Sequence, residues 1–314
     1  MKHDPSALID IVIVNWNSGP QLYNCILSIE RNGSGLFRKI IVVDNGSSDQ
    51  SLKNLDEFED LLLVKKKDNL GFAKACNVGA QFAEGKYILF LNPDAMLYED
   101  TLDKTLTFMD HPQNSHIGIC GVRLLDDQGL PAVSAARFPT LRVMLGTSLN
   151  LSKIASKIFP SHLMNSNELN INRYVDQVIG AYFFVRKSVF DMCNGFDEDF
   201  FVYFEEVDFS LRAKKLGFQS YYLADVFAYH KGGGCSDRVK DVRLFYSLRS
   251  RLIYARKHYS FFARLALVLL TIIEFPLRAA RGLFRGSWSD IKNTFSAYFM
   301  LARYFWWGEH GSNR

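Results

Sequence analysis

The chain has 314 residues, of which 48% are hydrophobic and 22% are charged, and its formal net charge is +4. This composition is typical of a folded globular protein and excludes a disordered chain. The net charge is too small to indicate nucleic-acid binding. No segment reaches the about 18–20 consecutive apolar residues that cross a bilayer, so the sequence predicts no transmembrane helix.

Cysteine usage and the N-terminus bear on the cellular compartment. The five cysteines are scattered, and no Cys-x-x-Cys motif occurs. Such a pattern is typical of buried thiols in a reducing compartment, not of a disulfide framework or a zinc site. Residues 1–7 are polar and do not resemble a signal peptide. We therefore expect a cytoplasmic protein.

Strand-like and helix-like segments alternate over the first 126 residues. The nearly continuous apolar run 8–16 predicts a strand buried on both faces, further apolar segments predict more strands, and the stretches between them predict helices. A β-α-β-α order implies a parallel sheet with right-handed crossovers, so the expected fold class is α/β. The predicted strands are 8–16, 39–43, 61–64, 87–91 and 117–125, and the predicted helices are 21–31, 71–83 and 97–109.

The rest of the chain has a weakly patterned middle and a helical C-terminal part. Residues 129–175 show little periodicity, so we expect loops and short helices there. A helical pattern begins near residue 242, and we therefore divide the chain into an α/β domain, 1–240, and a basic, aromatic-rich helical region, 241–314. Within the α/β domain the pattern also predicts a strand at 177–186, a helix at 204–216 and a strand at 218–230.

Polar residues follow three of the predicted strands at the point where each strand ends. They are Asn15-Trp16-Asn17, Asp44-Asn45 and Asn92-Pro93-Asp94. Ligands of parallel α/β sheets bind beyond the carboxyl ends of the strands. We therefore expect these three clusters to meet along one edge of the sheet.

Asp44 and Asp94 are the acidic members of these clusters. A carboxylate at position 44 can accept a hydrogen bond from a pyrimidine base or a ribose hydroxyl, or it can close a simple Asx turn. Mg²⁺ and Mn²⁺ prefer hard oxygen ligands and bind through one or two carboxylates together with substrate phosphates. Asp94 suits that task, and its alternative is to cap the helix expected after residue 97.

Three carboxylates occupy the start of the helix expected at 204–216: Glu205, Glu206 and Asp208. The helix dipole favours acids there without any further function. The functional interpretation is a general base that takes a proton from a hydroxyl nucleophile. The aromatic run 200–204 would desolvate such a base and raise its pKa.

His230 follows the last predicted strand and precedes the glycines 232–234. A neutral imidazole can bind Mn²⁺ or contact a diphosphate, although a lone histidine is more often structural. Glycines allow the backbone to approach phosphate oxygens closely, but three in a row are a weak signal.

In combination, these features resemble the family 2 inverting glycosyltransferases of the GT-A fold, which has a Rossmann-like, mostly parallel sheet. Within that family they resemble the rhamnosyltransferase-like branch that builds bacterial surface polysaccharides. The resemblance spans about residues 8–258. The motifs that carry it are Ile13–Asn17, Val42–Asp49, Asn69–Ala73 with Asn77 and Gly79, Leu91–Asp94, Gly180–Arg186, Gly195–Phe201, Glu205–Asp208 and His230–Gly233.

The resemblance implies a role for each candidate residue. Asp94 and His230 would be the metal ligands, for Mg²⁺ or Mn²⁺. Glu206 stands where the family usually has an aspartate base, so the base is Glu206, Glu205 or Asp208. Gly180 and Ala181 would border the acceptor. Independently of the resemblance, we expect the weakly patterned residues 129–175 to form an acceptor wall. The donor nucleotide would be bound by Asn15, Asp44, Asn45, Asn69, Asn77 and Asn92.

The function implied is transfer of a sugar, with L-rhamnose from dTDP-rhamnose preferred, from a nucleotide-diphosphate donor to a glycan or lipid-linked hydroxyl. Two alternatives stay open. The Glu206 departure permits a nucleotide-sugar-binding scaffold that has lost turnover. A sugar nucleotidyltransferase is less favoured, because residues 15–19 lack the basic residue of its usual glycine-rich loop.

The C-terminal region differs in charge from the rest of the chain. Residues 251–314 contain ten Lys/Arg and three Asp/Glu, a net charge of +7, which leaves −3 for the remainder. Basic residues with several Tyr, Phe and Trp suit a helix that lies among lipid headgroups. We therefore expect a peripheral position on the inner face of the cell membrane. The alternative is a helical subdomain that packs on the core or on a second protomer.

Overall fold

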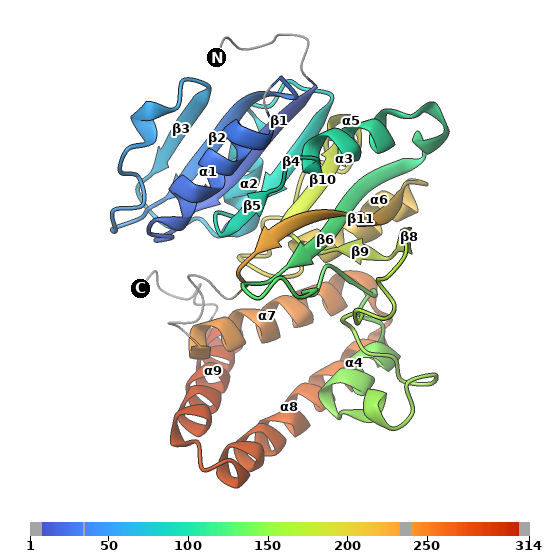
Figure 1. Cartoon of the computed structure of the whole chain (residues 1–314). Coiled ribbons are helices and arrows are strands. Elements are labelled where there is room, and N and C mark those ends of the chain that lie inside the picture. The colour runs from blue at the N-terminus through green and yellow to red at the C-terminus, as the bar shows by residue number, and fades with distance from the viewer. Residues whose placement is uncertain (1–7, 34, 233–239, 308–314) are drawn as a thin grey trace. The chain divides into compact units, whose positions relative to one another are not determined.

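A computed structural model describes residues 8–33, 35–232 and 240–307 (Figure 1). The chain divides into two compact units. The second unit takes in two short segments, 139–162 and 199–204, that the sequence pattern had assigned to the α/β domain. The first unit comprises Met1–Phe138, Leu163–Glu198 and Glu205–Cys235, and the second comprises Pro139–His162, Asp199–Phe204 and Ser236–Arg314.

The first unit is built on a sheet of nine strands within the described residues (Figure 1). The strand order is β3-β2-β1-β4-β10-β6-β11-β5, with β8 beside β11, while β7 and β9 form a separate pair. The strands are β1 (Ile9–Asn15), β2 (Phe37–Asn45), β3 (Leu61–Lys66), β4 (Tyr87–Leu91), β5 (Ala95–Leu97), β6 (Ile117–Leu125), β7 (Ala135–Ala136), β8 (Arg173–Val175), β9 (Gln177–Val178), β10 (Tyr182–Arg186) and β11 (Gln219–His230).

The strands from β3 to β4 run parallel, and the strands β6 and β11 run parallel to each other. The strand β10 lies between these two groups and is antiparallel to both β4 and β6. The sheet is therefore mixed but mostly parallel, which confirms the predicted α/β class.

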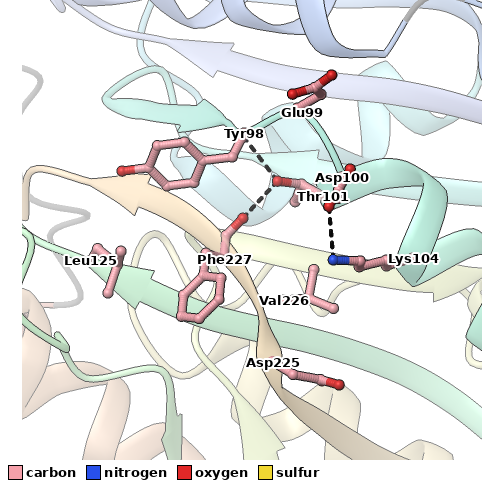
Figure 2. A pocket seen from close by; sticks show the side chains of 9 residues that line it. All are labelled: Tyr98, Glu99, Asp100, Thr101, Lys104, Leu125, Asp225, Val226 and Phe227. Atoms are coloured by element: carbon pink, nitrogen blue, oxygen red, sulfur yellow. Dashed lines mark hydrogen bonds and ion pairs between the residues drawn. The ribbon is translucent and has the colours of Figure 1, made fainter.

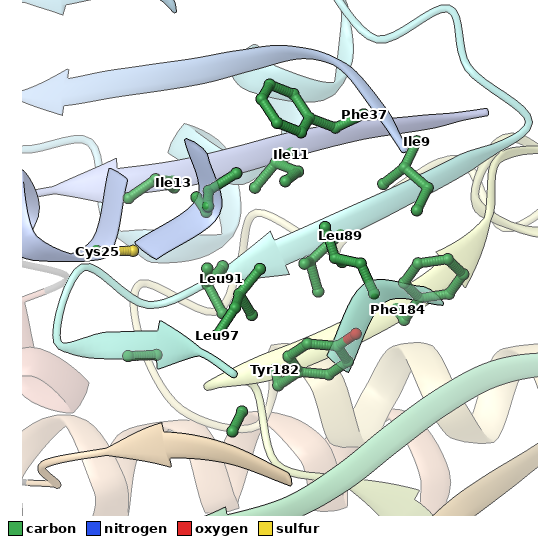
Figure 3. Close-up of a cluster of buried hydrophobic side chains, with 14 of the residues drawn as sticks. Ile9, Ile11, Ile13, Cys25, Phe37, Leu89, Leu91, Leu97, Tyr182 and Phe184 are labelled. Carbon is green, nitrogen blue, oxygen red and sulfur yellow. The ribbon is translucent and has the colours of Figure 1, made fainter. Parts of the chain in front are cut away.

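Helices cover both faces of this sheet. Along β1 the residues alternate: Ile11 and Ile13 pack with α1 and α3 on one face (Figure 3), and Val12 and Val14 pack with α2, α5 and α6 on the other. Burial on both faces explains why this strand has no polar alternation. The helices are α1 (Gln21–Asn32), α2 (Phe72–Ala80), α3 (Thr101–Asp110), α5 (Lys187–Met192) and α6 (Glu205–Lys215), and short 3₁₀ helices span Leu55–Glu57 and Pro112–Asn114.

The helix α2 lies unusually close to the sheet because its inner face carries small residues. A Cβ atom added at Gly79 would lie 2.4 Å from Cγ1 of Val12 and 3.2 Å from Cγ2 of Val43. Ala73 and Ala75 are also fully buried there. A larger residue at position 79 would push α2 away from β1 and β2.

Two predicted elements differ from the structure. The helix expected at 97–109 begins only at Thr101, because Ala95–Leu97 forms β5 and pairs antiparallel with β11. Asp94 therefore caps no helix. The strand expected at 177–186 is broken between β9 and β10, and in the break the carbonyl of Ala181 accepts a hydrogen bond from the Asn92 amide.

The described part of the second unit is mainly helical. It contains two hydrophobic clusters. One is formed by Met144, Ala255, Leu267 and Leu270, and the other includes Phe245 and Ala297. None of the described helices is both long and apolar enough to cross a membrane. The helices are α4 (Leu141–Ser148), α7 (Lys240–His258), α8 (Phe261–Phe284) and α9 (Trp288–Trp307), with a 3₁₀ helix at Leu151–Lys153.

Candidate active site

The ends of β1 and β2 meet through Asn15 and Asp44. The parallel register places these two residues side by side, and Nδ2 of Asn15 donates to Oδ1 of Asp44 at 2.9 Å. The same amide donates to Oγ of Ser51 at 2.8 Å, and both Asn15 and Asp44 are buried. Since β4 pairs in parallel with β1 on its other side, the expected meeting of the three polar clusters at one sheet edge is confirmed.

The loop after β2 is held by the residues that follow β1. Oδ1 of Asn17 accepts hydrogen bonds from the amides of Ser48 at 2.8 Å and Asp49 at 3.2 Å. Burial alone would raise the pKa of Asp49, but hydrogen bonds from Ser51 and Gly19 outweigh it and hold that pKa below its usual value. The polar edge is therefore pre-formed by hydrogen bonds, as a binding surface for a nucleoside would need.

Asn45 ties the end of β2 to the segment before α2. Its Nδ2 donates to Oδ1 of Asn69 at 2.9 Å, and its Oδ1 accepts from the Leu70 amide at 2.8 Å. Gly46 has φ +75, and a Cβ there would lie 3.0 Å from the carbonyl carbon of Asp68. Asn45 and Asn69 thus lie together, beside the pair of Asn15 and Asp44.

Asn77 has a different environment from the other predicted nucleotide ligands. Its Nδ2 donates to the Phe196 carbonyl at 2.8 Å, and its Oδ1 accepts from the Phe196 amide at 2.9 Å. Both ends of the amide are therefore engaged with the segment before α6. A role for Asn77 in nucleotide binding stays a prediction, and its contacts in the structure hold two elements together.

Asn92, Asp94 and His230 come together where β5 pairs with the end of β11. Nε2 of His230 lies 3.4 Å from Oδ1 of Asp94 and 3.5 Å from Nδ2 of Asn92. The backbone supports this approach, because His230 pairs with Ala95 and the Lys231 amide donates to the Asp94 carbonyl at 3.2 Å.

The chemistry of Asp94 and His230 fits a divalent ion of the Mg²⁺ or Mn²⁺ type. A carboxylate oxygen and an imidazole nitrogen are both ligands for Mn²⁺. Within the described residues no group of three His, Cys, Asp or Glu side chains could hold a metal by itself. The remaining positions would be left to water and substrate phosphates, which is the usual arrangement for ions that assist phosphate chemistry.

The three carboxylates at the start of α6 occupy different environments. Asp208 is fully buried, and its Oδ2 accepts from Nε of Arg212 at 2.7 Å. Arg212 also donates to the Gly195 carbonyl at 2.9 Å. Asp208 therefore anchors Arg212 against the turn before α6 and is poorly placed to receive a proton from a substrate.

Glu205 and Glu206 are neighbours at the start of α6. Glu205 is buried, and Glu206 is half-buried. Burial, followed by the negative charge of Glu206, raises the pKa of Glu205 well above its usual range. Oε2 of Glu205 is buried and has no hydrogen-bond partner among the residues the structure describes. Glu206 is the more accessible of the two.

The backbone that enters α6 is strained. Tyr203 and Phe204, which directly precede Glu205 in the chain, have φ +67 and +73. Bulky residues rarely adopt positive φ, and such strain is concentrated at functional sites. The aromatic run that the sequence analysis assigned to desolvation thus has a second feature, which no local pattern reveals.

A pocket of about 380 Å³ opens at the far end of β5 from Asp94 (Figure 2). The aromatic residues Tyr98 and Phe227 are 45% and 38% exposed there. Oγ1 of Thr101 fixes the rim, because it donates to the Phe227 carbonyl at 2.6 Å and accepts from the Tyr98 amide at 2.9 Å. No sequence motif identifies these residues, since only the pairing of β5 with β11 brings them together. The other lining residues are Glu99, Asp100, Lys104, Leu125, Asp225 and Val226.

Comparison with known proteins decides the family. Residues 10–164 match the model of the family described as Glycosyl transferase family 2. The chain belongs to glycosyl transferase family 2. The matched part contains Asn15, Asp44 and Asp94, whereas α6 and His230 lie beyond it. The resemblance seen in the sequence motifs is confirmed.

Two curated relatives act in glycan assembly according to their names. "Low-salt glycan biosynthesis hexosyltransferase Agl10" of Haloferax volcanii is 26% identical over 211 residues, which are 66% of this chain and 62% of that protein. The "N-acetylglucosaminyl-diphospho-decaprenol L-rhamnosyltransferase" of Mycobacterium tuberculosis is 25% identical over 244 residues, which are 71% of this chain and 76% of that protein. The chain thus spans less than two thirds of the first relative's length.

A solved structure extends the likeness over nearly the whole chain. Mannosyltransferase PcManGT from Pyrobaculum calidifontis, in complex with GDP-Man and Mn²⁺, has a TM-score of 0.57 and covers 98% of this chain and 90% of that chain. At 12% sequence identity this likeness shows the fold alone. It confirms the expected GT-A architecture with a helical extension.

Proposed function

We propose that the chain transfers a sugar from a nucleoside-diphosphate donor to a hydroxyl acceptor, with inversion at the anomeric carbon. The observation that carries the proposal is the juxtaposition of Asn92, Asp94 and His230 at the sheet edge where Asn15 and Asp44 also lie. This edge offers polar groups for a nucleoside and, next to them, ligands for an ion that a diphosphate needs. The donor would lie across the ends of β2, β1 and β4.

The diphosphate end of the donor would lie near Asp94 and His230. These two side chains would hold Mg²⁺ or Mn²⁺, which supplies Lewis-acid stabilisation of the leaving diphosphate when bound. Asp44 and Asn15 would orient the nucleoside. Because their hydrogen bonds already exist in the protein, little conformational entropy is lost when the donor binds.

Among the three acids of α6, we assign Glu206 as the general base. Asp208 is committed to Arg212, and Glu205 is buried with a raised pKa that favours its neutral form. The hydroxyl oxygen of the acceptor forms a bond to the anomeric carbon as the bond to the diphosphate oxygen breaks. The hydroxyl proton passes to the Glu206 carboxylate. Attack from the face opposite the diphosphate inverts the anomeric configuration without a covalent sugar intermediate.

The acceptor would be a glycan or a lipid-linked glycan. The pocket in Figure 2 supports this proposal, because the exposed aromatic residues Tyr98 and Phe227 line it together with the acids Glu99 and Asp225. Sugar rings offer apolar C–H faces for the aromatic rings and hydroxyls for the acids. The name of the mycobacterial relative, with its diphospho-decaprenol substrate and L-rhamnosyl product, supports L-rhamnose from dTDP-rhamnose as the donor sugar.

Thermal unfolding with UDP, dTDP or GDP, each with and without Mn²⁺, tests the donor site. A ligand that binds only the folded state raises the unfolding midpoint by mass action. We expect a Mn²⁺-dependent rise with dTDP that exceeds the rises with UDP and GDP. A larger rise with another nucleotide would contradict the rhamnose assignment alone, and no rise with any nucleotide would contradict the donor site.

Turnover is the second part of the test. With dTDP-L-rhamnose, Mn²⁺ and a prenyl-diphosphate N-acetylglucosamine acceptor, we expect release of dTDP and a product whose anomeric configuration, read by NMR, is inverted. Nucleotide binding without turnover of any donor would favour a binding scaffold. Retention of configuration would contradict the single-displacement mechanism.

A further inference from the structure

The helix α8 is apolar on opposite sides, yet only one of these sides is buried. Leu267 and Leu270 face inward and pack with Met144 of α4 and Ala255 of α7. On the other side lies a continuous exposed face, which we call the α8 apolar face. It is formed by Phe262, Leu265, Leu269, Ile272, Ile273 and Leu277.

No charged residue interrupts the α8 apolar face from Phe262 to Leu277. Its members recur every three or four residues, so they form one stripe along the helix. Ile272 and Ile273 are 61% and 52% exposed. A helix that is hydrophobic all round is normally buried on all sides, and a soluble monomer rarely leaves such a large patch in water. The face therefore requires an occupant.

The apolar surface continues through the turn into α9. Phe284 and Trp288, on either side of this turn, are 93% and 77% exposed, and Phe295 and Phe299 are exposed further along α9. The two helices pack tightly near the turn, where a Cβ at Gly282 would lie 2.7 Å from Cγ1 of Ile291. Figure 1 shows α8 and α9 as the two arms of a helical hairpin.

Exposed charges on this hairpin are of one sign. Arg281, Arg285 and Lys292 are exposed, as is Arg303. The acid of α8, Glu274, is buried and paired with Arg251 at 2.6 Å and with Arg278 at 3.2 Å. Asp290 of α9 is only partly exposed. An apolar face beside exposed cations matches a surface that offers both hydrocarbon and negative charge.

We propose that α8 and α9 dock on a bilayer that contains anionic phospholipids, with the α8 apolar face buried among the acyl chains near the headgroups. A second copy of this chain would bring further positive charges such as Arg281 and Arg285, whereas an anionic bilayer offers charge of the opposite sign, which favours the bilayer as the occupant. Arginines, lysines and boundary aromatics are the side chains that stabilise helices in the interfacial layer. The hairpin lies in the plane of the membrane, since no described helix can cross it.

Flotation of the full-length protein with vesicles tests this docking. We expect the protein to float with vesicles of phosphatidylglycerol and phosphatidylcholine, and to float much less with phosphatidylcholine alone or at high salt, because screening weakens the attraction to anionic headgroups. Protein that stays unbound with phosphatidylglycerol vesicles at low salt would overturn the proposal.

A pair of variants separates the α8 apolar face from general surface hydrophobicity. The double variant Leu269→Glu, Ile273→Glu should lower the vesicle partition coefficient at least about tenfold, because two exposed aliphatic side chains that enter the bilayer are replaced by charges. The matched control Ile171→Glu, Met192→Glu changes two residues of similar exposure in the first unit and should float like the wild type. Equal flotation of the α8 variant and the wild type would overturn the proposal.

Two further measurements keep the test independent of the variants. If the α8 variant is unfolded by circular dichroism, tryptophan fluorescence of the wild type replaces it. Brominated phosphatidylglycerol vesicles should quench this fluorescence, because Trp288 and Trp306 are strongly exposed on α9. Absence of quenching would overturn the proposal. The proposal would also be overturned if light scattering showed that the wild type forms a stable dimer in solution and that this dimer does not bind vesicles.

Discussion

Oδ1 of Asp94 lies 3.4 Å from Nε2 of His230, although the two residues belong to opposite halves of the sequence. The contact exists because the three-residue strand β5 pairs with the last residues of β11. It places a hard oxygen ligand and an imidazole at the sheet edge where a nucleoside diphosphate would end. We therefore expect both side chains to matter for donor binding.

Replacement of Asp94 by Asn should weaken Mn²⁺-dependent binding of the nucleotide. Removal of a residue that only hydrogen-bonds a metal ligand lowers metal affinity about 10–100-fold, so removal of a ligand itself should lower it at least as much. The measurement is the rise in unfolding midpoint as dTDP is titrated with and without Mn²⁺. The control Asp191→Asn removes an exposed carboxylate that pairs with Lys187. An unchanged Mn²⁺-dependent rise in Asp94→Asn would contradict the metal-site assignment.

The Glu206→Gln variant should lose transfer while keeping donor affinity within about twofold. A general base contributes about 10²–10⁴-fold to the rate, and the amide of glutamine cannot accept the proton. Transfer is measured as dTDP release under saturating donor, and donor affinity by calorimetry. Asp208→Asn is the comparison, because its carboxylate is ion-paired with Arg212, and we expect it to lower stability more than rate. Parallel loss of donor affinity and transfer in Glu206→Gln would argue against the base assignment.

The Glu205 carboxyl should make stability depend on pH. Burial, and then the charge of Glu206, raise its pKa in the folded state well above the value in the unfolded chain. Between these two pKa values the folded state binds more protons than the unfolded state, so the free energy of unfolding falls as pH rises. This fall begins above about pH 4.3, the unfolded pKa of Glu, and ends at the folded pKa.

Urea unfolding from pH 4 to pH 8 checks this prediction. The Glu205→Gln variant cannot ionise at position 205, so it should be more stable than the wild type at neutral pH and should show a flatter dependence on pH. The exposed Glu99→Gln variant is the control. A pH dependence in Glu205→Gln as steep as in the wild type would show that other groups cause it.

The Gly79→Ala variant should destabilise the first unit. A Cβ at this position would lie 2.4 Å from Cγ1 of Val12, and such overpacking costs about 1–3 kcal/mol, which outweighs the gain in helix propensity. Denaturant unfolding monitored by circular dichroism gives the value. At Gly180 no heavy atom lies within 4 Å of an added Cβ, so Gly180→Ala should change stability little. Equal stability of the two variants would contradict the close packing of α2 on β1.

Tyr98 provides a test of the acceptor pocket. Tyr98→Ala should raise the KM for the acceptor several-fold and leave donor affinity unchanged, because its exposed side chain lines the pocket and Tyr98 is not among the predicted donor-binding residues. Tyr98→Phe retains the ring and should restore most of the acceptor affinity. Initial-rate measurements at varied acceptor give both constants. An unchanged acceptor KM in Tyr98→Ala would exclude this pocket from acceptor binding.

Strong local patterns determined much of the fold. The predicted strands 87–91 and 117–125 coincide with β4 and β6, because long apolar runs between turn residues admit one interpretation. The polar residues that end β1, β2 and β4 were also placed correctly, since parallel strands share one carboxyl edge. Hydrophobic runs and turn residues are local features, so they can be recognised in the sequence without knowledge of tertiary contacts.

Tertiary structure alone decided the rest. Residues 95–97 carry no strand signal of their own and form β5 only because β11 offers them a partner, and this pairing brings His230 to Asp94 and opens the pocket at Tyr98. Asp208 differs from Glu205 and Glu206 in its surroundings, and this difference likewise arises from contacts between residues distant in the sequence. One of them is the hydrogen bond from Arg212 to the Gly195 carbonyl. An apolar sequence pattern predicts that a side chain is shielded from water. Only the packing of α8 on α4 and α7 shows which of its apolar faces stays exposed.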